Sequence, residues 1–126
     1  MSNIEFIDVK TARKFVGDLI IYVLTDRILV REAIKRFPHD VKDASVKSAY
    51  HALIHREADE DLRRADLAYR DEQDSYLEQI ARILQQGQEL PKNIIKNYNY
   101  YYRNIEINHS NLFKTFIKKM CKWLNV

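Results

Sequence analysis

The feature that most constrains the fold is residues 43–86, a stretch that contains neither glycine nor proline. Its apolar residues recur mostly at steps of three or four, which is the period of one face of an α-helix. Most of the residues between them favour helices. The stretch is therefore predicted to be helical, from an N-cap at Asp43 or Ser45 to a stop at Gly87. The apolar face comprises Val46, Tyr50, Ile54, Ala58, Leu62, Ala65, Tyr69, Tyr76, Ile80 and Ile83.

One continuous helix over residues 43–86 would be roughly 65 Å long. That length exceeds the core of a compact domain of this size, so one end would project or pair with a second chain. The alternative is a kink or break near 71–75, where Ser75 and Glu78 have the spacing of a capping box and the apolar face lapses. We favour the continuous helix, with both ends packed and the acidic middle facing solvent or a partner.

The rest of the chain predicts an all-α fold. The chain has 126 residues, which suits a single domain over residues 1–126. It has only two glycines and two prolines, so it has few turn signals and favours a few long helices. We predict a bundle of four to five helices around the long central one. The other helices are expected at about 9–24, 26–37, 91–105 and 112–124.

The N-terminal third of the chain contains a segment that could be helix or hairpin, and a glycine inside a predicted helix. Residues 19–24 and 28–30 are strand-like in composition and could form a hairpin around Thr25 and Asp26. We favour helices, because both flanks have helical spacing. Gly17 lies inside the first predicted helix, where glycine costs about 1 kcal/mol relative to alanine. Its presence there indicates a close contact between helices.

Cysteine usage and hydropathy bear on the compartment. Cys121 is the single cysteine, which excludes an internal disulfide and fits a reducing environment. The longest apolar run, residues 19–24, is far too short to cross a bilayer. No secretory signal pattern is visible. We expect a cytoplasmic protein without a transmembrane segment, and a homodimer formed through the long helix is one possibility.

The net charge of +3 conceals an asymmetry. Residues 43–78 contain ten acids and five bases, so this segment has a net charge of −5. Residues 91–126 contain seven bases and one acid, which gives +6. The two segments could pack with opposite charges facing each other, or the basic segment could bind an anionic partner.

Three residues suggest a metal site. His51, His55 and Asp59 are spaced by four, so they project in one row from the predicted long helix. Imidazole and carboxylate ligands both suit zinc and related ions. However, the sequence lacks both HExxH and paired Glu-x-x-His motifs. The more common explanation is two half-exposed histidines beside the core.

A second candidate surface is aromatic and basic. Tyrosines interleaved with cations can stack on bases and neutralise phosphates. The simpler explanation is core tyrosines with their hydroxyl groups at the rim. A basic, amphipathic last helix could dock on its own bundle, in a partner's groove or on an anionic surface. The candidate residues are Lys96, Tyr98, Tyr101, Tyr102, Arg103, Lys114, Lys118 and Lys122.

The sequence gives little support for an enzyme. It has no glycine-rich phosphate loop, no GxSxG motif and no cysteine pair, and it indicates neither a cofactor nor a small-molecule substrate. Paired catalytic carboxylates within residues 55–66 would require one carboxyl in an apolar pocket. The leading hypothesis is a non-enzymatic interaction or regulatory module that binds a protein partner or itself. Nucleic-acid binding through the C-terminal region is the alternative, and metal binding through His51 and His55 is a weaker one.

Overall fold

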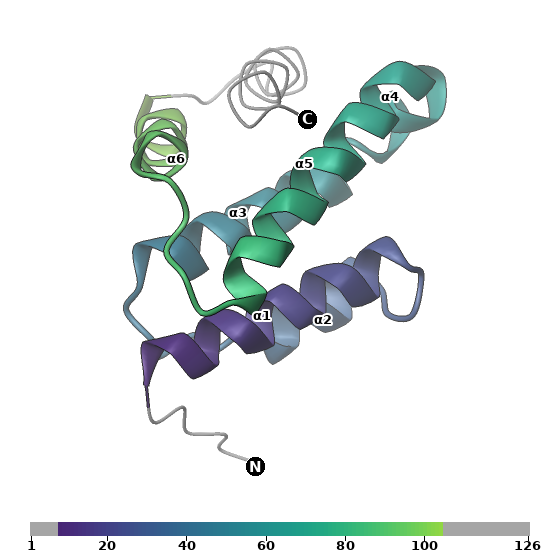
Figure 1. Cartoon of the computed structure of the whole chain (residues 1–126). Coiled ribbons are helices and arrows are strands. Elements are labelled where there is room, and N and C mark those ends of the chain that lie inside the picture. The colour runs from purple at the N-terminus through teal and green to yellow at the C-terminus, as the bar shows by residue number, and fades with distance from the viewer. Residues whose placement is uncertain (1–7, 105–126) are drawn as a thin grey trace.

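The computed structural model describes residues 8–104 of the chain, and these residues form six α-helices and no strand (Figure 1). The predicted all-α bundle is therefore confirmed. The helices are α1 (Val9–Leu24), α2 (Val30–Arg36), α3 (Ala44–Ala58), α4 (Glu60–Ala65), α5 (Leu67–Gln85) and α6 (Lys92–Asn104). The helix predicted at 112–124 lies outside the described residues.

The first two helices are separated by a turn. The Asp8 carboxylate caps α1 by accepting a hydrogen bond from the Thr11 N–H at 2.7 Å. The helix ends at Leu24, and Asp26 then adopts a left-handed backbone conformation with φ of 60°, which aspartate tolerates better than most residues. Because residues 19–24 are helical and α2 begins only at Val30, the hairpin alternative is wrong, and α2 is shorter than predicted.

The continuous helix predicted over 43–86 is also wrong. The stretch is helical almost throughout, but it divides into α3, α4 and α5 at Asp59 and Asp66. The predicted break at 71–75 does not occur, since Ser75 lies in the middle of α5. The Asp66 carboxylate starts α5 by accepting a hydrogen bond from the Tyr69 N–H at 3.0 Å. The chain thus turns back on itself, and α4 forms the tip where α3 and α5 meet (Figure 1).

The two glycines have the roles that the sequence suggests. Gly17 lies where α1 meets α5, and a Cβ atom there would be 2.7 Å from the Ala81 carbonyl oxygen and 2.8 Å from Gln85 Cγ. The predicted close contact is therefore confirmed. Gly87 follows α5 with φ of 76°, a left-handed conformation that ends the helix at low cost.

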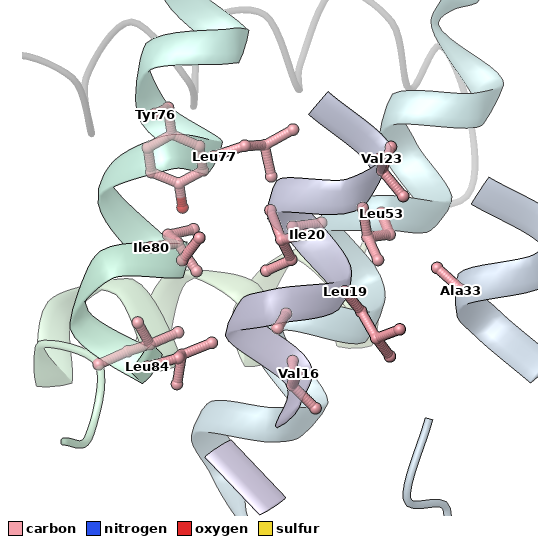
Figure 2. Packing of buried hydrophobic residues seen from close by; sticks show 14 of the residues in the cluster. Val16, Leu19, Ile20, Val23, Ala33, Leu53, Tyr76, Leu77, Ile80 and Leu84 are labelled. Atoms are coloured by element: carbon pink, nitrogen blue, oxygen red, sulfur yellow. The ribbon is translucent and has the colours of Figure 1, made fainter. Parts of the chain in front are cut away.

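The core lies mainly between α1 and α5, with α2, α3 and α6 closing it. Figure 2 shows one face of α1 directed at one face of α5, with Leu53 of α3 and Ala33 of α2 nearby. On α6, Tyr98 is only 1% exposed, and its hydroxyl group accepts a hydrogen bond from Tyr76 OH at 3.2 Å. The buried residues that α1 and α5 contribute to this core include Val16, Leu19, Ile20, Val23, Tyr76, Leu77, Ile80 and Leu84, with Leu19 and Val23 directed toward α2 and α3.

Across residues 8–104, no helix combines the length and the apolar character needed to cross a membrane.

Candidate binding groove at the α2–α3 junction

A surface groove lies where α2 ends and α3 begins. The helix α2 stops before Pro38, because a residue that precedes proline is disfavoured in the helical region, and Phe37 is extended with ψ of 144°. The chain then turns and enters α3, which leaves a hollow of about 410 Å³. Its lining residues are Phe37, Pro38, His39, Val41, Lys42, Asp43, Ala44, Val46, Lys47 and Tyr50. We call this hollow the aromatic groove.

Aromatic rings are packed edge to face along the aromatic groove. The Tyr50 ring lies 5.6 Å from Phe37 and 5.7 Å from His39, with interplanar angles of 67° and 83°. His51 contacts the same tyrosine at 5.6 Å and 64°. Edge-to-face geometry is the favourable arrangement for aromatic pairs. The His39 Nε2 atom also lies 2.9 Å from the Ile34 carbonyl oxygen, which holds its ring beside the groove.

One side of the aromatic groove is braced by a half-buried ion pair. The Asp43 carboxylate accepts hydrogen bonds from Arg13 Nε at 3.1 Å and Nη2 at 2.8 Å. It also caps α3 by accepting from the Val46 N–H at 3.1 Å. Arg13 Nη1 donates to the Gly87 carbonyl oxygen at 3.0 Å. This hydrogen bonding to Asp43 raises the pKa of Arg13. The α3 N-terminus is therefore tied both to α1 and to the turn after α5.

The rim of the aromatic groove is positively charged. Lys42 and Lys47 line it and are exposed, and within residues 8–104 neither lysine forms an ion pair. The Asp43 carboxylate is already neutralised by Arg13. His51 lies on the next turn of α3. Its pKa is lowered to about 4, mainly by burial and secondly by the positive charge of Lys47.

The predicted metal ligands lie on α3 and at its C-terminus. His55 and Asp59 are buried, whereas His51 is only half-buried and packs against Tyr50. Asp59 accepts a hydrogen bond from Tyr69 OH at 2.8 Å. Within the described part of the chain, no group of three or more His, Cys, Asp or Glu side chains is arranged to hold a metal ion. A metal ion bound by His51, His55 or Asp59 would therefore need further ligands from outside the described residues.

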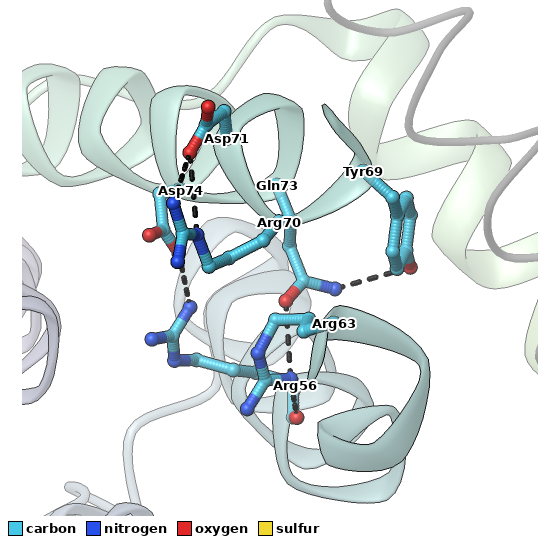
Figure 3. Close-up of polar contacts among 7 residues, drawn as sticks. All are labelled: Arg56, Arg63, Tyr69, Arg70, Asp71, Gln73 and Asp74. Carbon is cyan, nitrogen blue, oxygen red and sulfur yellow. Dashed lines mark hydrogen bonds and ion pairs between the residues drawn. The ribbon is translucent and has the colours of Figure 1, made fainter. Parts of the chain in front are cut away.

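A polar network that the sequence did not reveal holds the turn between α3 and α5 (Figure 3). Gln73 Nε2 donates to Tyr69 OH at 3.2 Å, and Arg63 donates to Gln73 Oε1 at 3.2 Å and to the Arg56 carbonyl oxygen. Arg56 in turn pairs with Asp74. Burial, reinforced by Asp59, raises the pKa of Tyr69, so this hydroxyl stays protonated and serves as a donor. The network is structural, since its side chains satisfy one another.

The acidic middle of residues 43–86 is partly exposed. No residue of α4 is buried, and Leu67 directly after it is 57% exposed. The burial of His55 and Asp59, however, corrects the expectation that the whole middle faces solvent. Burial and nearby Arg56 lower the pKa of Arg63, which lies beside a hollow of about 220 Å³ between α4 and the start of α5.

The structure divides the predicted C-terminal surface. Tyr98 is a core residue and cannot stack on a base, whereas Lys96 is exposed and Tyr100 is 65% exposed. For Tyr98, the simpler explanation of a core tyrosine is confirmed. The side chains of Tyr101, Tyr102 and Arg103, and the residues Lys114, Lys118 and Lys122, lie outside what the structure describes.

The chain matches no protein-family model, no curated protein and no solved structure.

Proposed function

We propose that this chain is a non-enzymatic interaction module that binds a partner protein through the aromatic groove. The observation that carries the proposal is an open hollow of about 410 Å³ lined by Phe37, Pro38, Val46 and Tyr50. Protein segments are commonly held by one large side chain that fills such a pocket, while the rest of the segment contributes less energy. The volume of the groove suits a large anchoring side chain.

The polar groups of the groove favour binding over catalysis. A catalytic or small-molecule site usually directs several polar groups at one point. Here the Asp43 carboxylate is occupied by Arg13 and by the N–H of Val46. The lysines lie on the exposed rim. An apolar floor with charged edges is the usual arrangement of a protein-binding patch.

The groove is also held in place before binding. The hydrogen bonds from Arg13 to Asp43 fix the start of α3, and the edge-to-face contact between Phe37 and Tyr50 fixes the floor of the groove. Such preorganisation reduces the entropy that a partner must lose on binding. A stable groove is therefore expected to bind short segments measurably.

The proposal is tested by selecting short random peptides on the full chain. Selected peptides are then titrated by fluorescence anisotropy against the wild type and an Ala44→Trp variant. Ala44 is exposed at the start of α3 and lines the groove, so the indole would fill the hollow without disturbing the core. Ala68→Trp, at an exposed alanine of α5, is the matched control.

We expect Ala44→Trp to weaken binding by about tenfold or more, which is about 1.4 kcal/mol, and Ala68→Trp to leave it unchanged. Peptides that bind both tryptophan variants as tightly as the wild type would refute the groove as the binding site. Failure to select any binding peptide would count equally against the proposal.

A further inference from the structure

We infer that the aromatic groove selects an acidic protein segment with one aromatic or large aliphatic anchor. The anchor enters the hollow that Phe37 and Tyr50 line, and carboxylates of the same segment pair with Lys42 and Lys47. This inference rests on the proposed function and specifies the chemistry of the partner.

The floor of the groove is apolar, and it therefore favours an aromatic or large aliphatic anchor. Phe37 is almost fully buried and Tyr50 half-buried, and their rings meet edge to face at 5.6 Å. Pro38 and Val46 add aliphatic surface beside them. An aromatic anchor would extend the same edge-to-face packing, and each such pair contributes about 0.5–1.5 kcal/mol beyond the area it buries.

The acidic character follows from the charges around the groove. Lys42 and Lys47 have no ion-pair partner within residues 8–104, while Asp43 has its charge neutralised by Arg13. Asp40 is the exposed carboxylate nearest in sequence, but it does not line the hollow. Rim charges of one sign favour partners of the opposite sign and raise the association rate.

The positive potential extends beyond the rim. Lys35 and Arg36 are exposed in the last turn of α2, immediately before the groove. At the other end, burial is the main cause of the lowered pKa of His51, and the charge of Lys47 adds to it. Exposed cations therefore lie on both sides of the α2–α3 junction, and Asp40 is the exposed carboxylate between them.

A protein segment fits better than a nucleic acid. Bases bind single-strand proteins by stacking on exposed aromatic faces. The Tyr50 ring is instead in edge-to-face contact with three other rings, those of Phe37, His39 and His51. The hollow can hold a single side chain, whereas a run of stacked bases would need aromatic faces that these contacts already use.

The test uses the tightest peptide from the selection described above. It is compared with a neutral form in which each Asp or Glu is replaced by Asn or Gln. Both are titrated against the full wild-type chain and a Lys42→Glu/Lys47→Glu variant. The control variant, Lys92→Glu/Lys96→Glu, makes the same charge change on exposed lysines of α6.

We expect the acidic form to bind the wild type roughly tenfold more tightly than the neutral form, because two exposed ion pairs contribute up to about 1 kcal/mol each and tenfold corresponds to about 1.4 kcal/mol. That preference should disappear in the groove variant, persist in the α6 control and shrink with added salt. Circular dichroism checks that both variants fold.

Three outcomes would overturn the inference. If the neutral form binds as tightly as the acidic one and Ala44→Trp still blocks it, the groove binds protein but does not select acid, and only this inference fails. If a labelled oligothymidylate displaces the peptide from the groove, the site is one for nucleic acid. If the chain forms a dimer by sedimentation and Ala44→Trp dissociates it, the occupant is a second copy.

Discussion

Replacing Gly17 with alanine should destabilise the fold, although alanine is the better helix former. In the structure, a Cβ atom at this position would lie 2.7 Å from the Ala81 carbonyl oxygen and 2.9 Å from the Gln85 backbone nitrogen. These are backbone atoms and cannot rotate away, so α1 and α5 would have to move apart. Overpacking of this kind costs about 1–3 kcal/mol, and we place this case at the upper end.

The helix propensity of alanine offsets about 1 kcal/mol of that cost. The net loss for Gly17→Ala should therefore be about 2 kcal/mol, which lowers the Tm by about 8 °C for a chain of this length. A second change, Gln85→Ala, removes the side-chain contact at Cγ but leaves the backbone contacts, so it should restore only part of the loss. Lys14→Ala, on the exposed face of α1, is the control and should change stability by less than about 0.5 kcal/mol.

Urea unfolding followed by circular dichroism measures these differences through the midpoint, with an unchanged slope as the check on two-state behaviour. If Gly17→Ala were as stable as the wild type or more stable, the close α1–α5 contact would be refuted, since propensity alone would then determine the outcome.

Three further predictions concern buried polar groups. Tyr69→Phe should cost about 1–3 kcal/mol, because it removes the hydroxyl donor to the buried Asp59 carboxylate. By the same urea assay, Tyr22→Phe keeps the ring that contacts Arg27 and should change stability by less than about 0.5 kcal/mol. Asp43→Ala should cost about 2–3 kcal/mol by thermal unfolding, since it removes both the cap of α3 and a half-buried ion pair; Asp43→Asn, which retains the cap, should cost less, and equal losses would contradict this explanation. The pKa of His51 is lowered from 6.5 to about 4, so on acidification the unfolded chain gains a proton at a higher pH than the folded chain does. The stability contributed by neutral His51 is therefore complete above pH 6.5 and is lost as the pH falls toward 4. His51→Gln should reduce the fall in the urea midpoint over that range, and an unchanged fall would exclude this histidine as the source.

The helical content was predictable because the apolar periodicity is a local property. The cap at Asp43 and the stop at Gly87 were also predictable, because a cap depends on residues within one turn. Gly17 was informative for a related reason: a glycine inside a helix is costly unless a neighbour requires the space.

The chain reversal at Asp59 and Asp66 could not be predicted in the same way. It occurs without glycine or proline, and the sequence offered a better capping pattern at Ser75. The turn depends on hydrogen bonds between residues ten positions apart, such as Tyr69 to Asp59 and Arg63 to Gln73. A local pattern contains no information about such partners. The one local signal was Asp66 itself, which caps α5 three residues before Tyr69.

The aromatic groove was equally hidden from sequence reasoning. The end of α2 before Pro38 is a local effect of proline, but the contact between Phe37 and Tyr50 depends on how α2 and α3 pack. By contrast, Tyr98 was weighed as both a binding and a core residue, and helical spacing alone could not choose between them. Its hydrogen bond with Tyr76, on another helix, places it in the core.

The aromatic groove is tested most directly by an NMR titration of the full, ¹⁵N-labelled chain with the tightest selected acidic peptide. The largest amide shifts should fall at Phe37 and within residues 41–50, and they should be absent in Ala44→Trp. Shifts concentrated on α4 and the start of α5, or shifts that persist in the Ala44→Trp variant, would show that the partner binds elsewhere and would contradict the proposed function.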